Sequence, residues 1–147
     1  MLRFLVINGP NMDVLGRRER GIYGSATLED LEALCVRWGE TNGVYVECLQ
    51  SNHEGDLIEM VHRGSEEFQG VVMNAAGYGH TSVALRDAVS ACSVPVVEVH
   101  MTNVASRETF RHRSLLTPVV RGLVMGLGIK GYVLALQALK DMAEGGV

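Results

Sequence analysis

One segment of the sequence combines a tyrosine with several arginines, which together could supply a base for proton removal. The segment GRRERGIYG, residues 16–24, places Tyr23 among three arginines and three glycines. A free tyrosine has a pKa near 10, so only about one molecule in a thousand is ionised at neutral pH, and a close guanidinium favours the phenolate. The segment is therefore either a solvated surface loop or a mobile element in which arginine activates the tyrosine.

A glutamate and a histidine further along the chain could donate a proton. Glu98 and His100 are separated by one residue, so both lie on the same face of a predicted strand. A carboxylate that accepts one ring N–H fixes the tautomer and supports an imidazolium, which is a general acid suited to neutral pH. The alternative is a buried pair that only holds the loop after the strand.

Three arginines follow the same predicted strand and could hold an anion. Arg107, Arg111 and Arg113 lie close together, and the first two would share a face if this stretch were helical. A solvated run of charge is the usual interpretation of such a cluster. Because the chain carries a net charge of −4, a local clamp for a carboxylate or a phosphate is an equally good interpretation.

Short apolar runs that alternate with helical patterns must position these groups. The expected strands are Leu2–Ile7, Val44–Leu49, Gly70–Met73, Val94–Val99 and Val119–Met125. The expected helices are a segment capped by Thr27 and Asp30 that stops at Gly43, then Asp56–Phe68, Ser82–Ala91 and Lys130–Met142. Strands that alternate with helices in this way predict a parallel sheet covered on both faces. We expect one α/β domain over residues 1–147, a flavodoxin-like three-layer sandwich with five parallel strands in the order 2-1-3-4-5.

The loops after the first four strands are polar and rich in amides. They read NGPNMDVLG, QSNHEG, NAAGYGHTS and HMTNVASRETFRHRS. In a flavodoxin-like sheet the ligand crevice lies outside the carboxyl ends of the strands, beside strands 1 and 3. His80 lies in the third loop, next to a glycine and before the candidate helix N-caps Thr81 and Ser82. A lone histidine is often structural, but this location indicates a functional one.

The composition excludes several classes of protein. The chain is 47% hydrophobic and 20% charged, as expected for a soluble globular protein. Its acidic balance argues against a nucleic-acid partner. Cys35, Cys48 and Cys92 form no CxxC pair and indicate reduced core thiols in a cytoplasmic protein. No apolar run reaches the length of a membrane span, and the first residues do not read as a signal peptide, so we expect no membrane partner.

Two further groupings resemble sites but lack the spacing that those sites need. The side chains of His53, His80, His100 and Glu98 could be combined into a metal-ligand set, but they show no dense ligand spacing, so we expect a site without metal. The segment GLGIKG, residues 126–131, matches a dinucleotide fingerprint, yet only 16 residues follow it. We expect it to form a tight turn from strand to helix.

Five motifs, in order and in register, resemble those of the type II 3-dehydroquinate dehydratases. They are INGPN…LG.RE…YG, QSNHEG, N…HTSVALRDA, EVH..N and RE.FR..S. The resemblance covers nearly the whole chain and implies the flavodoxin-like fold. It also implies the anti elimination of water from 3-dehydroquinate through an enolate, without a cofactor, in the shikimate pathway or in quinate catabolism.

The resemblance assigns roles to the residues at matching positions. Tyr23 would remove the C2 proton as a phenolate beside Arg18, and Asn11 would hold a water that stabilises the enolate. His100, oriented by Glu98, would protonate the departing hydroxyl. The groups implied to bind the substrate are Asn74, His80, Arg111 and the backbone N–H groups that begin at Met101 and Thr102.

The resemblance also implies an assembly, and it has exceptions. Asp87 matches an aspartate that reaches a neighbouring subunit's site, which implies a homododecamer built as a tetramer of trimers. The positions that depart from the family pattern are Arg20, Ala76, Gly79, Thr102 and the ASRET run at 105–109. None removes a proposed catalytic group, but together they leave the exact substrate open.

Two other functions compete with this interpretation. One is a diverged paralogue that dehydrates a related cyclic hydroxy-keto acid. The other is a non-catalytic flavodoxin-like binding module. Against the binding module, the NGPN loop has no phosphate-cradling pattern, and no acidic pair follows it for magnesium.

Overall fold

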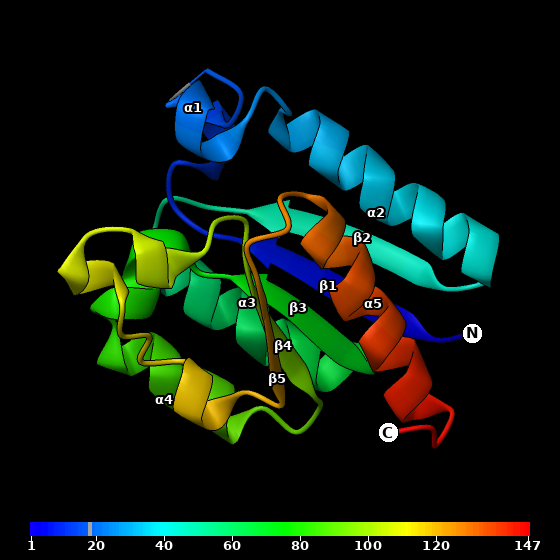
Figure 1. The fold of residues 1–147 in the computed structure, drawn as a ribbon. Coiled ribbons are helices and arrows are strands. Elements are labelled where there is room, and N and C mark those ends of the chain that lie inside the picture. The colour runs from blue at the N-terminus through cyan, green and yellow to red at the C-terminus, as the bar shows by residue number, and fades with distance from the viewer. Residues whose placement is uncertain (18) are drawn as a thin grey trace.

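The computed structural model describes residues 1–17 and 19–147 and shows a parallel sheet with helices on both faces (Figure 1). The strand order is β2-β1-β3-β4-β5, which confirms the predicted flavodoxin-like arrangement. The strands are β1 Arg3–Asn8, β2 Tyr45–Gln50, β3 Gly70–Asn74, β4 Val96–His100 and β5 Gly122–Met125. The three central strands, β1, β3 and β4, are buried along almost their whole length, which explains their nearly continuous apolar sequences.

Four of the five described helices form two pairs, one on each face of the sheet, and the single turn α1 lies in the loop after β1. Their bounds are α1 Arg20–Tyr23, α2 Leu28–Asn42, α3 Glu54–Glu67, α4 Val83–Ala91 and α5 Lys130–Ala143. Helices α2 and α5 pack on one face, where Phe4 and Val6 of β1 point. Helices α3 and α4 cover the other face, where Leu5 and Ile7 point. The alternation of side chains along β1 thus supplies both halves of the core.

The helix boundaries follow the capping residues in the sequence. Thr27 accepts the Asp30 N–H and Asp30 accepts the Thr27 N–H, so the predicted capping box begins α2. Gly43 ends this helix with a φ of +68°, a conformation that favours glycine. Ser82 caps α4, because its hydroxyl accepts the N–H of Leu85 at 2.9 Å. These local signals fix where the helices start and stop relative to the loops.

The differences from the expected elements lie mainly at prolines and in one loop. Strand β4 begins after Pro95, which has no N–H for the ladder. Strand β5 begins at Gly122 because Thr117–Val119 form a 3-10 turn around Pro118. The single turn α1 was not expected from the sequence. The 3-10 turns are Met12–Val14, Ala76–His80, Val104–Ser106, Thr109–Arg111 and Thr117–Val119.

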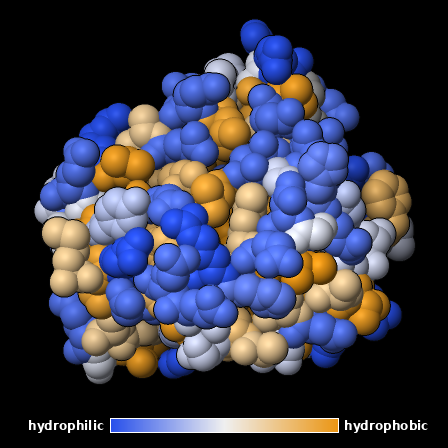
Figure 2. Space-filling model, turned by 180° about the vertical axis from the view of Figure 1, so that it is seen from behind, coloured by the Kyte–Doolittle hydropathy of each residue, from blue (hydrophilic) through white to orange (hydrophobic). Residues whose placement is uncertain are grey.

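The parallel strands bring the loops after β1, β3 and β4 together at one edge of the sheet (Figure 1). The opposite view shows a molecular surface on which hydrophilic residues alternate with small apolar groups (Figure 2). Within the described residues, no helix has both the length and the apolar character needed to cross a membrane.

Candidate active site

A cavity of about 160 Å³ opens at the carboxyl edge of the sheet. Its walls come from the loop after β1, the 3-10 turn after β3 and the long segment after β4. The lining residues are Pro10, Asn11, Met12, Tyr23, Asn74, Ala76, Gly77, His80, His100, Met101, Thr102, Val104, Arg107 and Arg111. The cavity therefore lies where the sheet topology predicts a ligand crevice.

The tyrosine of the arginine-rich loop lies against an arginine from a distant part of the chain. Arg107 donates from Nη1 to the Tyr23 hydroxyl at 2.8 Å, and its guanidinium carbon lies 5.0 Å from the centre of the tyrosine ring. The carboxylates of Glu19 and Glu108 lie 4.0 Å and 3.7 Å from this guanidinium. A cation at hydrogen-bond distance stabilises negative charge on the phenol oxygen. The predicted partner, Arg18, lies outside the described residues.

The loop that carries Tyr23 is held by contacts within itself. Gly16 and Gly24, with φ values of +88° and +79°, stand at its two ends. Arg20, which departs from the family pattern, donates from Nε to the Gly16 carbonyl at 2.8 Å. Arg17 is exposed, as expected for a solvated side chain. Arg20 therefore closes the loop rather than facing the cavity.

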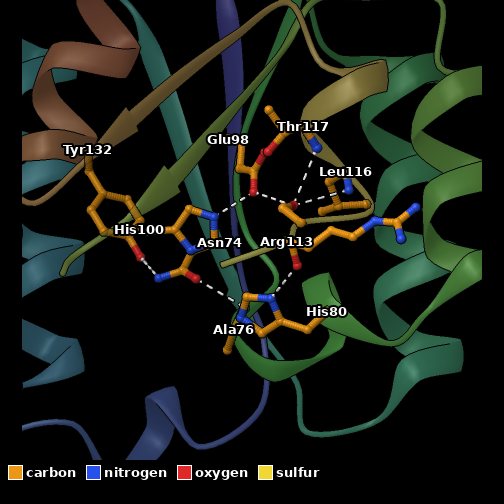
Figure 3. A network of polar contacts seen from close by, with 10 residues as sticks. Asn74, Ala76, His80, Glu98, His100, Arg113, Leu116, Thr117 and Tyr132 are labelled. Carbon is orange, nitrogen blue, oxygen red and sulfur yellow. Dashed lines mark hydrogen bonds and ion pairs between the residues drawn. The ribbon is translucent and has the colours of Figure 1, made fainter. Parts of the chain in front are cut away.

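The Glu98–His100 pair forms as predicted, and two further hydrogen bonds to Glu98, which the spacing does not indicate, hold the carboxylate in place. Glu98 is fully buried, and His100 Nε2 donates to its Oε2 at 2.5 Å (Figure 3). Ser114 donates to the same oxygen and Thr117 to Oε1, each at 2.7 Å. Burial raises the pKa of Glu98, but the hydrogen bonds from His100, Ser114 and Thr117 outweigh it and hold the pKa below the ordinary carboxyl value. A buried carboxylate thus accepts the Nε2–H of His100 and fixes the orientation of its ring.

His80 is both anchored and open to the cavity. Its Nδ1 lies 2.9 Å from the Arg113 carbonyl oxygen, which can only accept, so Nδ1 carries the proton. Nε2 is then left for a cavity ligand. The rings of His80 and His100 are stacked, with centroids 6.4 Å apart. Two imidazoles with different partners thus form one wall of the cavity.

Asn74 lines the cavity with a fixed carboxamide. Its Nδ2 donates to the Tyr132 hydroxyl at 2.8 Å, and its Oδ1 accepts the backbone N–H of Ala76 at 3.0 Å (Figure 3). Ala76 itself has a φ of +51°, in the left-handed region that glycine prefers. The backbone here has a conformation that favours glycine, which is the residue that the family resemblance leads us to expect at this position.

Asn11 also lies in the cavity wall in a left-handed conformation, with a φ of +70°. Its backbone N–H donates to Oδ1 of Asn52 at 2.9 Å. The same Asn52 oxygen accepts from Gln50, and the Asn52 carbonyl accepts the Tyr78 hydroxyl at 3.0 Å. Asn52 therefore links the loops after β1, β2 and β3 without lining the cavity itself.

The remaining predicted residues fall into two groups. Met101, Thr102 and Arg111 line the cavity, and Arg111 is braced by Glu108, which accepts from its Nε at 3.0 Å. Asp87 is exposed on α4 and does not line the cavity of its own chain. The segment that carries the arginine cluster is folded as 3-10 turns rather than one α-helix. Arg107 and Arg111 nevertheless meet at the cavity.

The segment GLGIKG has a structural role, and the possible metal-ligand set has no counterpart in the described residues. Gly126 and Gly128 have φ values of +88° and +60°, so GLGIKG is a tight turn between β5 and α5, as expected. Within residues 1–17 and 19–147, no three His, Cys, Asp or Glu side chains gather closely enough to hold a metal ion.

Sequence reasoning missed four kinds of contact at this site. The sequence indicates Arg107 as part of an anion clamp and not as the partner of Tyr23. The sequence indicates no specific role for Asn52 and no partner for the hydroxyls of Ser114 and Thr117. Tyr132 lies in the last helix pattern, where a buried tyrosine reads as core. A polar residue in an otherwise apolar helix face was the one available signal for Tyr132.

Comparison with known proteins gives consistent matches over almost the whole chain. A family model described as dehydroquinase class II matches residues 2–140. A 3-dehydroquinate dehydratase from Agrobacterium fabrum is 52% identical over 138 residues, covering 94% of this chain and 95% of the relative. One from Rhizobium meliloti is 49% identical over 139 residues, which are 95% of this chain and 94% of the relative. The crystal structure of a type II dehydroquinase from Butyrivibrio crossotus superposes with a TM-score of 0.93 at 41% identity, covering 95% of this chain and 97% of that chain.

Proposed function

The chain belongs to the class II dehydroquinase family, and from this membership we propose that it converts 3-dehydroquinate to 3-dehydroshikimate by elimination of water. The observation that carries the proposal is one cavity with a tyrosine beside a guanidinium and a histidine beside a buried carboxylate. The first pair supplies a base and the second an acid, which are the two proton-transfer groups that an elimination needs.

Tyr23 is the proposed base. As a phenolate it takes the C2 proton, and the electron pair left on carbon delocalises onto the neighbouring ketone oxygen to give an enolate. Arg107, at 2.8 Å from the hydroxyl, supports the ionised form, and Arg18 is proposed to act beside it. Asn11 is proposed to hold the water that stabilises the enolate oxygen. In many enzymes, hydrogen-bond donors that are in place before the charge develops make the largest single contribution to stabilising the transition state.

His100 is the proposed acid. As an imidazolium it donates a proton to the departing C1 hydroxyl while the enolate collapses, so that water leaves and the conjugated double bond forms. Nε2 is engaged by Glu98, which leaves Nδ1 to carry the transferred proton. Glu98 touches no substrate in this scheme and acts through the orientation and charge of the imidazole.

The remaining cavity residues are proposed to bind the substrate. Asn74 and His80 offer an amide and a ring nitrogen to the ring hydroxyls. Arg111, together with the backbone N–H groups that begin at Met101 and Thr102, offers donors to the carboxylate and the ring face. The acidic chain thus concentrates positive charge at the one place where its anionic substrate must bind.

We further propose that the reaction needs no cofactor and proceeds in the cytoplasm, in the shikimate pathway or in quinate catabolism. The relatives named above bear the name of the same reaction. The exposed position of Asp87 on α4 fits a role at the cavity of a neighbouring subunit, and we propose a homododecamer arranged as a tetramer of trimers. Analytical ultracentrifugation of the purified protein measures this state directly.

The proposed activity is tested by adding 3-dehydroquinate to the purified, metal-free protein. The product is a conjugated enone, so its formation is followed by ultraviolet absorbance. Turnover at rates of about 1–10³ s⁻¹, typical of enzymes, is the expected result. A folded protein that leaves the absorbance unchanged contradicts the proposal and favours a paralogue with a different hydroxy-keto acid as substrate.

A further inference from the structure

A buried tyrosine on α5 contacts the cavity residue Asn74 from the side of the core, away from the cavity. Tyr132 is fully buried in the core between the sheet and α5, and its hydroxyl lies 2.8 Å from Asn74 Nδ2 (Figure 3). The hydroxyl donates its only hydrogen to Oδ1 of Asn8 at 2.5 Å. Burial raises the pKa of Tyr132 well above its usual value, so this hydroxyl stays neutral. It therefore accepts from Asn74 and donates to Asn8.

These contacts fix which end of the Asn74 amide faces each of its partners. With the hydroxyl hydrogen committed to Asn8, the Tyr132 oxygen can only accept, so Asn74 must present its NH₂ group to it. At the other end, Asn74 Oδ1 accepts the Ala76 N–H at 3.0 Å. Rotation of the amide by 180° would break both contacts and set donor against donor at Ala76. The carboxamide is thus held in one orientation by two independent partners.

Asn8 supports this interpretation because, in the part of the chain that the structure describes, only the oxygen of its buried amide is used in a hydrogen bond. It is fully buried, and within the described residues its Nδ2 has no hydrogen-bond partner. An unpaired buried amide destabilises a fold, and an apolar residue at a purely structural position would avoid that loss. Asn8 contributes one oxygen, and that oxygen sets the direction of the Tyr132 hydroxyl.

We propose that Tyr132, directed by Asn8, is a positioning residue that presents one N–H and one lone pair of Asn74 to the substrate. Oδ1 of Asn74 keeps one lone pair beyond its contact with Ala76. The second N–H of Nδ2 lies toward Met12 Sδ, a weak acceptor at 3.9 Å, and can be shared with a substrate oxygen. A substrate hydroxyl both donates and accepts, so it can use the pair when the amide is fixed. Tyr132 also stabilises, through Asn74 and the Ala76 N–H, the turn that carries His80. This inference rests on the proposed function for the identity of the substrate and on the geometry for the rest.

The direct test removes the hydroxyl and keeps the ring. Tyr132→Phe is expected to raise the KM for 3-dehydroquinate about tenfold and to change kcat less than about threefold, because no proton-transfer group touches Tyr132. The matched control is Leu136→Ala, one turn along α5 in the same core cluster. It should lower the melting temperature by opening a cavity and leave KM unchanged. A raised KM in both variants would show that general loss of stability is responsible and would overturn the proposal.

Two double variants separate positioning from packing. Asn8→Leu with Tyr132→Phe replaces both polar partners by apolar ones, so stability should recover while KM stays raised. A KM that returns to the wild-type value together with stability overturns the proposal. In an Asn74→Ala background, Tyr132→Phe should raise KM no further, since its effect acts through the missing amide. An undiminished effect there contradicts it equally.

Hydrogen exchange gives a readout that does not depend on turnover. The amide hydrogen of Ala76 should exchange faster in Tyr132→Phe than in the wild type and in Leu136→Ala. Mass spectrometry of peptides that span residues 74–80 measures this exchange. Unchanged exchange in Tyr132→Phe would overturn the positioning role even if the enzyme is active. If the wild-type protein does not turn over 3-dehydroquinate, the proposed function fails, and the exchange result still decides the role of Tyr132.

Discussion

Arg107 and Tyr23 are 84 positions apart in the sequence, yet the guanidinium of one donates to the hydroxyl of the other at 2.8 Å. The tyrosine comes from the loop after β1 and the arginine from the turns after β4. The proposed base is therefore assembled from two loops that the parallel sheet delivers to the same edge. Its chemistry depends on their relative placement rather than on either loop alone.

Arg107→Ala is expected to lower kcat about 10²- to 10³-fold, because it removes the cation that stabilises the charged phenolate. KM should change less, since the loss lies mainly in the transition state. Steady-state kinetics with 3-dehydroquinate measures both. Arg17→Ala removes the same charge from an exposed position and serves as the control, with kinetics like the wild type. An unchanged kcat in Arg107→Ala would assign the activation of Tyr23 to another group.

Tyr23→Phe is expected to abolish turnover while the fold and the binding of a substrate analogue stay nearly intact. The substitution removes one oxygen from a half-buried side chain and leaves the ring against Arg107. Circular dichroism checks that the fold is unchanged, and calorimetric titration checks that the substrate analogue still binds. Wild-type kcat in this variant would show that the proton is removed by a different base.

The stability of the fold should depend on acid pH through Glu98. Its pKa is lowered in the folded protein because the hydrogen bonds from His100, Ser114 and Thr117 outweigh burial. The stabilisation is therefore complete above the ordinary carboxyl pKa, about 4.3, and is lost as the pH falls through the lowered folded value. Urea unfolding across this pH range should show a smaller loss for Glu98→Gln than for the wild type.

Glu66→Gln, at an exposed position on α3, is the control for this pH experiment and should keep the wild-type pH dependence. Equal slopes for the wild type and Glu98→Gln would show that Glu98 is not a source of the acid sensitivity.

Asn52→Ala is expected to lower kcat about tenfold, although Asn52 does not line the cavity. It removes the acceptor for the Asn11 N–H at 2.9 Å, which helps to hold Asn11 in its left-handed conformation. Kinetics and a crystal structure of the variant check the rate and the position of the loop. Asn42→Ala, at the end of α2 and remote from the cavity, is the matched control. Full activity with a displaced Asn11 would remove that residue from the catalytic scheme.

Treatment with EDTA is expected to leave kcat unchanged. A phenolate base and an imidazolium acid account for both proton transfers, so no metal ion is required by the proposed scheme. The rate is compared before and after dialysis against the chelator. Inhibition that is reversed by an added divalent ion would restore the metal-dependent alternative.

The elements that sequence reasoning predicted correctly are those specified by local signals. The Thr27–Asp30 capping box, the Gly43 stop and the Ser82 cap each depend on residues within a few positions of one another. The pairing of Glu98 with His100 is local as well, because both lie on one strand. Such features can be read from the spacing of a few residues. The alternation of strands with helices indicates a parallel sheet, and five strands in one small domain favour the flavodoxin-like order.

The features that could not be predicted depend on contacts between distant segments. The Arg107–Tyr23 and Tyr132–Asn74 bonds join residues whose separation in the sequence carries no periodic signal. Asn52 acts through a backbone N–H in another loop, so its side-chain type alone does not reveal its partner. Only the arrangement of the loops around the cavity shows these roles.

Within the described residues, the non-glycine positions with positive φ are Asn11, Glu19 and Ala76, and all three lie in the loops that surround the cavity. Each such conformation costs about 1–3 kcal/mol, which the rest of the fold must offset. Backbone strain is therefore present in the loops that hold the reactive groups. Attempts to make the enzyme more heat-resistant by placing glycine at these positions would relax the loops that carry the chemistry, so gains in heat resistance would trade against catalytic rate.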